Sequence, residues 1–249
     1  SSWSAPGAPP AASLGCAAGT CSAGGACIAW QSARSSRMRV RVARSVSPGR
    51  ACVCSSRSVR CSSDGAGAGG CSTGTAEMNT TLRGTVPDGE YVGLSFALAV
   101  PFDKNHNDPT LAAAPLNTTA MFWNWQGGYR FVRIDMVPVD KAADGPKGWF
   151  LHLGSTMCPA ASKTEAPTAE CKNPNHLPVS FAAFDPATNV VVIDPATVVA
   201  EADMKVNAPE TSPGCMSFPG DADCTTVMSK LGLPYGDIPA GTQQLVSMR

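Results

Sequence analysis

From Tyr91 onward, short apolar runs alternate with clusters of turn residues. Six of these runs are rich in aromatic or β-branched residues and are bounded by Gly, Pro, Asn or Asp, a pattern typical of strands. The six segments are Tyr91–Val100, Asn117–Gln126, Tyr129–Val137, Trp149–Ser155, Val179–Phe184 and Val190–Ile193. Gly127-Gly128 separates the second from the third and favours a hairpin with positive φ at its tip. The pattern predicts a mostly β fold, which is a barrel or, as we expect here, an antiparallel β-sandwich.

Two short helices are expected after the last of these strands. Asp194 is followed by a proline, so an N-cap and a proline at the first helical position should open a helix over Pro195–Met204. Asp223 similarly precedes Cys224–Leu231, and Gly232 ends that helix. Both helices are expected at an edge or cap of the domain.

Residues 1–72 differ sharply in composition from the rest of the chain. They contain 16 Ser, 14 Ala, 10 Gly, 8 Arg and 7 Cys, together 55 of the 72 residues, with no Phe or Tyr. Their 8 Arg and 1 Asp give a charge of +7, whereas the 11 basic and 18 acidic residues of 73–249 give −7. A segment so poor in large apolar side chains cannot fill a hydrophobic core. The folded domain is therefore expected to span residues 73–249.

Three interpretations of residues 1–72 stay open. The segment is a disordered low-complexity linker, a disulfide-rich module, or a stretch translated in the wrong reading frame. The third is attractive because GC-rich coding DNA read out of frame yields Ala, Gly, Arg, Ser, Pro and Cys without periodicity. The run Arg37–Val42 alternates with the period of a strand, so composition does not decide among the three. Translating the gene in its other two frames tests the third interpretation.

The cysteines fall into two sets. Seven lie before residue 72, an odd number at spacings that match no zinc pattern, so no disulfide map follows for them. The other four are Cys158, Cys171, Cys215 and Cys224, an even set in turn-rich surroundings without a CxxC spacing. Disulfides are favoured over a metal cluster here, and disulfides persist in oxidising compartments. The chain is therefore expected to be periplasmic or secreted, although no signal peptide is present in it and no apolar run is long enough to span a membrane.

The three histidines are candidates for chemistry. His106 and His176 lie in loops rich in Asn and Pro, whereas His152 lies inside a strand segment. Alternation along that strand places His152 on the face of Phe150 and Gly154, opposite the large apolar residues. A loop histidine is usually a surface residue and a strand histidine usually a hydrogen-bonded core residue, so each candidate is weighed against these ordinary roles.

Two tryptophans stand out in the segment Ala120–Asp135. With a period of two, Trp123 and Trp125 share one strand face with Met121, where packing in a core or interface would be their ordinary role. The chain shows no acid/base pair, nucleophile elbow or phosphate loop, and the glycines of 65–70 do not lie between a strand and a helix. We therefore expect neither catalysis nor a nucleic-acid partner.

Four blocks of sequence carry a resemblance to a known family. They are Asn117–Phe131, His152–Cys158, Cys171–Asn175 and Pro213–Ser217, the last followed by Cys224. Their combination looks like the MbnP-type family, the four-Cys proteins of the "metallo-mystery pair", which are related in function to the copper proteins CorA and MopE of methane-oxidising bacteria. The resemblance runs from about residue 71 to the end of the chain. Residues 1–70 show no counterpart of the strand-rich N-terminal region of that family.

The resemblance implies a copper-binding protein of copper homeostasis rather than an enzyme. In this family a MauG-like diheme c-type cytochrome peroxidase oxidises a tryptophan to kynurenine, which joins histidines at the copper ion. Carried onto this chain, His106 and His152 are the implied ligands, and Trp123 or Trp125 is the modified residue that joins them. Neutral imidazoles suit copper, and opening an indole ring adds a carbonyl oxygen and an aniline nitrogen to an apolar face.

The resemblance also implies that the four later cysteines are structural. The pairs Cys158–Cys171 and Cys215–Cys224 would close loops of 14 and 10 residues. Each disulfide would stabilise the fold by about 2–3 kcal/mol through the unfolded state. A cupredoxin-like electron carrier is a rival, because Cys171 and His176 have the spacing of a blue-copper loop. That rival lacks a Met soon after His176 and would leave Cys158 unpaired.

A second rival is a glycan-binding or adhesion β-sandwich. Trp123, Trp125 and Tyr129 would then form a platform on which a sugar stacks. This interpretation requires exposed rings and no metal, so the burial of the three rings tests it.

Overall fold

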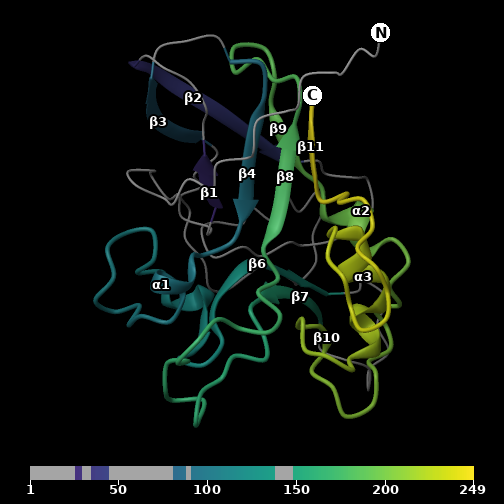
Figure 1. The fold of residues 1–249 in the computed structure, drawn as a ribbon. Coiled ribbons are helices and arrows are strands. Elements are labelled where there is room, and N and C mark those ends of the chain that lie inside the picture. The colour runs from purple at the N-terminus through teal and green to yellow at the C-terminus, as the bar shows by residue number, and fades with distance from the viewer. Residues whose placement is uncertain (1–25, 30–34, 45–80, 88–90, 138–147) are drawn as a thin grey trace, which may run out of the picture.

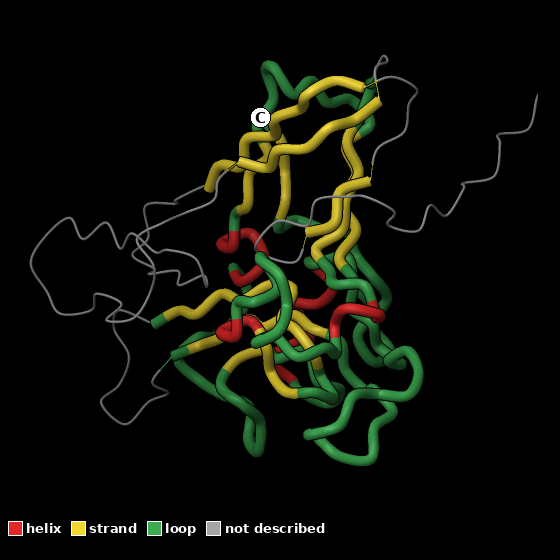
Figure 2. The backbone as a smooth tube through the Cα atoms, turned by 90° about the vertical axis from the view of Figure 1, so that its left-hand side faces the viewer, coloured by secondary structure: helices red, strands yellow, loops and turns green. Residues whose placement is uncertain are grey.

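The computed structural model describes residues 26–29, 35–44, 81–87, 91–137 and 148–249. Strands and loops predominate in this part of the chain and the helices are short, as Figure 1 shows from one side and Figure 2 after a quarter turn. The predicted mainly β fold is confirmed. The strands are divided among three small sheets.

The sheet that carries the candidate residues has four strands in the order β10-β7-β6-β5. Its strands are β5 (Phe122–Asn124), β6 (Gly128–Met136), β7 (Trp149–Gly154) and β10 (Gly214–Cys215). β6 and β7 pair antiparallel, with Arg133 opposite His152 and Asp135 opposite Phe150. β10 pairs parallel with β7. The pairing of β6 with β7 therefore brings His152 beside Arg133 and Asp135.

Two further sheets lie above this one in Figure 1. One has the order β1-β4-β8, with β1 (Ala26–Ala29), β4 (Leu94–Leu98) and β8 (Leu177–Phe181), all antiparallel. The other has the order β11-β9-β2-β3, with β2 (Ser35–Arg44), β3 (Thr81–Pro87), β9 (Val191–Ile193) and β11 (Val246–Met248). β2 and β9 are parallel, while the other two pairs are antiparallel.

Two of these strands come from the segment 1–72. The remainder of that segment, the side chains of its seven cysteines and the expected domain boundary near Thr73 lie outside the described residues. The three interpretations of the segment therefore stay as predictions.

Every strand predicted from residue 91 onward is present, but several are shorter than expected. The clearest case is Asn117–Gln126, of which only Phe122–Asn124 is extended, because Thr119–Met121 forms a 3-10 turn. In this turn the carbonyl of Ala120 accepts hydrogen bonds from the guanidinium groups of Arg130 and Arg133 on the neighbouring strand. These arginine contacts hold the turn against the sheet, and β5 therefore begins only at Phe122.

The helices are α1 (Phe102–Asn105), α2 (Pro195–Val199) and α3 (Thr225–Lys230). The prediction that Asp194 caps α2 is confirmed, since its Oδ1 accepts from the backbone N–H of Ala196 at 3.1 Å, but α2 ends at Val199 rather than at Met204. The helix predicted over Cys224–Leu231 is present as α3, but the prediction that Asp223 caps it was wrong. Asp221 caps the 3-10 turn Ala222–Cys224 instead, while the Asp223 carboxylate binds the backbone N–H of Ala208.

The core lies where alternation along β7 predicted it. Trp149, Leu151 and Leu153 are almost completely buried, while His152 occupies the opposite face with Phe150. Both disulfides are present, Cys158–Cys171 and Cys215–Cys224, and the second is fully buried within the core. The first disulfide closes the loop that follows β7, and the second links β10 to the 3-10 turn Ala222–Cys224.

Candidate metal site

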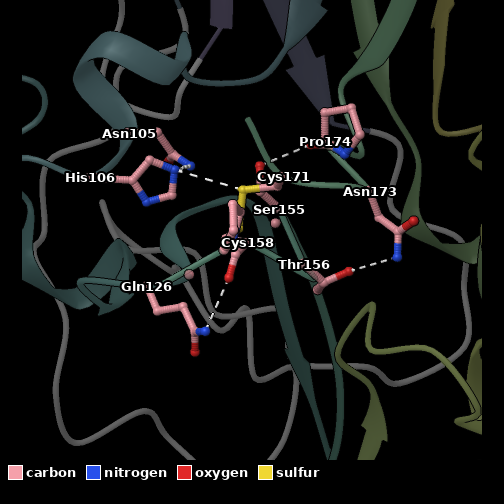
Figure 3. Close-up of a disulfide and its surroundings, with 12 residues drawn as sticks. Asn105, His106, Gln126, Ser155, Thr156, Cys158, Cys171, Asn173 and Pro174 are labelled. Carbon is pink, nitrogen blue, oxygen red and sulfur yellow. Dashed lines mark hydrogen bonds between the residues drawn. A yellow bond between two sulfur atoms is a disulfide. The ribbon is translucent and has the colours of Figure 1, made fainter. Parts of the chain in front are cut away.

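His106 lies at the C-terminal end of α1, in the buried space between that helix and the hairpin of β5 and β6. Its side chain is only 5% exposed. Nδ1 lies 3.0 Å from the carbonyl oxygen of Trp125, and Nε2 lies 3.2 Å from the amide nitrogen of Asn105 and 3.9 Å from the sulfur of Cys171. Figure 3 shows the ring aimed at that sulfur. A carbonyl only accepts hydrogen bonds, so Nδ1 carries the proton and Nε2 holds the lone pair.

Asn105 fixes the surroundings of this ring. Its side chain is fully buried, and its Oδ1 accepts from the backbone N–H of Tyr129 at 2.9 Å while its Nδ2 faces His106. Gly128, with φ of 71°, permits this approach, because a Cβ there would lie 2.4 Å from the Asn105 carbonyl oxygen. Burial lowers the pKa of His106, opposed by its hydrogen bond to Trp125. The imidazole is therefore neutral at pH 7, with both nitrogens engaged.

His152 has one engaged nitrogen and one open nitrogen. Its Nε2 lies 2.7 Å from Oδ1 of Asp135, whereas its Nδ1 is buried and has no hydrogen-bond partner. Burial lowers the pKa of His152, opposed by the hydrogen bond to Asp135, so the ring is neutral and its Nε2–H donates to the carboxylate. The Nδ1 lone pair is consequently unpaired in a buried position, which is costly unless a ligand uses it.

Asp135 is held in turn by Arg133. The Nε and Nη2 atoms of that arginine donate to Oδ2 at 2.8 and 2.6 Å, and the pair forms a salt bridge. Burial alone would raise the pKa of Asp135, but the hydrogen bonds from His152 and Arg133 hold it below its usual value. A histidine whose second nitrogen donates to a carboxylate is the arrangement commonly found around metal ligands, because it fixes the tautomer and raises ligand basicity.

Trp123 lies on the same face of β7 as His152, because its indole packs against Gly154. A Cβ on Gly154 would lie 2.5 Å from Cζ3 and 3.0 Å from Cη2 of Trp123, so the indole rests directly on the backbone of β7. Gly154 is two residues after His152 and shares its strand face, about 7 Å along the strand. The indole also contacts the half-exposed ring of Phe218, with 5.7 Å between the ring centroids. The structure thus places one candidate tryptophan on the His152 face.

Trp125 occupies a different environment, and the expectation that both tryptophans share one strand face was wrong. β5 ends at Asn124, whose side chain accepts from the backbone N–H of Gly127 at 2.8 Å and so starts the turn that contains Trp125. In this turn the Trp125 ring packs edge-on against Phe122, 6.1 Å between centroids. Neighbouring strand positions face opposite sides of a sheet, so this contact lies away from Trp123.

The structure therefore groups the four predicted residues into two pairs. Trp123 lies with His152, whereas the backbone of Trp125 holds His106 beside the Cys158–Cys171 disulfide. Sequence reasoning missed Asp135 and Asn105, the side chains that orient the two imidazoles. Asp135 lies in the same strand segment as Arg130 and Arg133, but only the pairing of β6 with β7 shows which histidine it meets.

The chain matches the MbnP family over residues 66–217, more than half of its length. It belongs to the MbnP family. The structure is similar to that of MbnP from Methylosinus trichosporium, with a TM-score of 0.63, 25% sequence identity, and coverage of 86% of this chain and 98% of that chain. No match was found among curated proteins. Membership of the MbnP family supports a role connected with copper.

The two rival interpretations fit this MbnP-family structure poorly. The sulfur of Cys171 is bonded to Cys158, so it is not a thiolate ligand of a blue-copper site. Tyr129 is 2% exposed and its hydroxyl donates to the carbonyl of Leu116, so it cannot join a sugar platform.

His176 is exposed, with its ring edge against Phe131. Within the described residues, no helix combines the length and apolar character needed to cross a membrane.

Proposed function

We propose that this chain is a periplasmic or secreted copper-binding protein of copper homeostasis, without catalytic activity of its own. One observation carries the proposal: the buried Nδ1 of His152 has no partner, while the other ring nitrogen is fixed by Asp135. Imidazole nitrogen is a preferred copper donor, and an ion at this position would satisfy the lone pair. Copper bound there would be held by a ligand whose tautomer the fold has already selected.

The proposed ligand set is His152, His106 and a kynurenine made from tryptophan. Nδ1 of His152 is open in the structure, so it is the anchor of the site. Nε2 of His106 accepts from Asn105, so His106 joins the ion only when that amide releases it. The kynurenine would supply a carbonyl oxygen and an aniline nitrogen, donors that an indole lacks.

Trp123 is the better placed of the two candidates for oxidation. Its indole lies on Gly154, on the face of β7 that presents His152, and contacts the half-exposed ring of Phe218. Trp125 has its ring against Phe122 and contributes to the His106 region only through its carbonyl. Oxidation of Trp123 would therefore create new donor atoms close to the open nitrogen.

The oxidant in this proposal is hydrogen peroxide, used by a partner MauG-like diheme c-type cytochrome peroxidase. Two molecules of peroxide accept four electrons and four protons from the indole and its two attacking waters, and are reduced to four waters. The two attacking waters supply the oxygen atoms that replace the C2–C3 bond of the indole, which gives N-formylkynurenine. Hydrolysis then releases C2 as formate and leaves kynurenine, with a net mass change of about 4 Da. The half-exposed Phe218 ring beside Trp123 is consistent with electron transfer through the surface to a docked heme protein.

Peptide mass spectrometry of the protein made with and without the diheme enzyme tests this proposal. We expect the gain of about 4 Da only after co-expression, and fragment ions that assign it to Trp123 rather than to Trp125. A Trp123→Phe variant made with the enzyme is the matched control and should show no gain. An unmodified Trp123 in a copper-loaded, co-expressed sample would contradict the proposal.

A further inference from the structure

A second cluster of donor atoms consists of His106 and the two cysteines of the first disulfide, and does not include His152. Nε2 of His106 and the sulfurs of Cys158 and Cys171 all lie within 4.8 Å of one another, and all three residues are buried. The separation between Nε2 and the Cys171 sulfur is 3.9 Å. A metal ion about 2.0–2.3 Å from nitrogen and sulfur ligands holds them about 3.6–3.8 Å apart at tetrahedral or trigonal angles. The histidine already lies at nearly the distance that a shared ion requires.

The lone pair of His106 is directed at these sulfurs. Its Nδ1–H donates to the Trp125 carbonyl at 3.0 Å, so Nε2 is the unprotonated nitrogen and the fold fixes the ring orientation. A ligating histidine characteristically donates its other N–H to a backbone carbonyl in this way. The group that competes for Nε2 is the Asn105 amide at 3.2 Å, which could turn its N–H toward a negatively charged thiolate.

The backbone keeps the two cysteines adjacent independently of their disulfide. Thr156 and Asn173 exchange backbone hydrogen bonds of 2.9 and 3.1 Å, and Lys172 N–H donates to the Met157 carbonyl at 3.1 Å. Figure 3 shows Thr156 and Asn173 near the disulfide, with the side chain of Asn173 donating to the Thr156 hydroxyl at 3.2 Å. Gln126 also binds the Cys158 carbonyl at 3.1 Å. Breaking the sulfur–sulfur bond would therefore leave both side chains near His106.

We propose that reduction of the Cys158–Cys171 disulfide opens a Cu(I) site formed by two thiolates and Nε2 of His106. A dithiol reductant supplies two electrons and two protons, is itself oxidised to a disulfide, and leaves two cysteine thiols. Binding of Cu(I) then displaces the two thiol protons. Two thiolates and one imidazole form a soft ligand set that selects Cu(I). The loop 159–170 between the two cysteines contains no buried residue, so few packing contacts separate a reductant from the two sulfurs.

This site is independent of the copper site proposed above, apart from the shared use of His106. It needs no oxidised tryptophan and no contribution from His152, and it exists only in the reduced protein. The two proposals therefore fail separately: His152→Ala removes the anchor of the first site and leaves the second intact.

Anaerobic Cu(I) titration of the reduced full chain against a chromophoric Cu(I) chelator tests the proposal. We expect the protein made without the diheme enzyme to bind one more high-affinity equivalent than the Cys158→Ser/Cys171→Ser variant. Cys215→Ser/Cys224→Ser is the matched control that loses the other disulfide and should keep this equivalent. The seven cysteines before residue 72 are common to all samples, so their contribution cancels. Equal binding by the wild type and the Cys158→Ser/Cys171→Ser variant overturns the proposal.

Histidine-labelled ¹⁵N NMR of the same reduced chain provides a readout that does not depend on altering the site. His152→Ala and His176→Ala variants assign the His106 signals by elimination. On Cu(I) addition we expect Nε2 of His106 to shift strongly while Nδ1 stays protonated. Unshifted His106 signals in the copper-loaded reduced protein would show that the imidazole is not a ligand and would overturn the proposal.

Discussion

The regions around His106 and His152 look alike by burial and differ in hydrogen bonding. Both side chains are 5% exposed, and burial lowers the pKa of both. His106 has its two nitrogens engaged by Asn105 and the Trp125 carbonyl, whereas His152 has Nδ1 without a partner. Burial and a lowered pKa therefore do not distinguish the two histidines, and only the state of the second ring nitrogen does. A histidine with one ring nitrogen bound to a carboxylate and the other left without a partner, as in His152, is the stronger indication of a metal ligand.

The largest expected difference between the two regions concerns the tryptophans. In protein made with the diheme enzyme, Trp123→Phe should lower copper affinity by at least about 100-fold. Removing a residue that only hydrogen-bonds to a metal ligand costs about 10–100-fold, and removing a ligand should cost more. Trp125→Phe keeps the backbone carbonyl that binds His106 and should change the affinity much less. Competition against a chromophoric copper chelator measures both. Equal losses in the two variants would show that the tryptophans do not belong to separate regions.

A smaller effect is expected from the carboxylate behind His152. Asp135→Asn keeps the shape of the side chain but removes the negative charge that fixes the Nε2–H tautomer. Copper affinity should fall by about 10–100-fold, as for other outer partners of metal-ligating histidines. Asp237→Asn, at an exposed carboxylate, is the control and should leave the affinity unchanged. An Asp135→Asn protein with full affinity would remove this residue from the site.

The pH dependence of stability should follow from the three histidines, because burial lowers the pKa of His106, His152 and His176. Their pKa values lie below the ordinary 6.5, so below that pH the unfolded chain binds protons that the folded chain does not. The free energy of unfolding should therefore be fully retained above 6.5 and decrease as the pH falls toward the lowered pKa values. Denaturant midpoints from about pH 8 to about pH 5 measure this slope. His152→Gln should reduce it, and an unchanged slope would contradict the assigned neutral state.

The smallest predicted effect lies beside the disulfide of the His106 region. Met157 has φ of 57° and is 56% exposed, a conformation that glycine adopts without a clash of Cβ. Met157→Gly should raise the free energy of unfolding by about 1 kcal/mol, since the strain relieved exceeds the entropy lost. Chemical denaturation measures it. Met157→Ala retains the Cβ and should gain nothing, so a similar gain in both variants would point to a cause other than backbone strain.

Much of the fold could be predicted from local pattern. Alternation in Trp149–Ser155 placed the core face and the histidine face of β7 correctly, because a half-buried strand is specified by its own sequence. The helix cap at Asp194 was likewise local. The turn at Thr119–Met121 was not predictable, since it depends on arginines of another strand. The division into three sheets depends similarly on pairings between distant segments.

The site was predicted as a set of residues but not as an arrangement. The histidines and tryptophans were found from composition and family resemblance, yet strand alternation put Trp123 and Trp125 together because it assumed that the strand continues through 125. The side chain of Asn124 ends the strand by accepting from the Gly127 N–H, and this one hydrogen bond separates the two tryptophans. Asp135 and Gly154 acquire their roles only through the pairing of β6 with β7.

The central claim is that the open nitrogen of His152 anchors copper. Copper competition titration of the His152→Ala protein, made with the diheme enzyme, tests it most directly. His176→Ala is the matched control, because His176 is an exposed histidine outside both regions. The account predicts that His152→Ala loses the high-affinity copper equivalent while His176→Ala keeps it. Unchanged copper affinity in a folded His152→Ala protein would contradict the account.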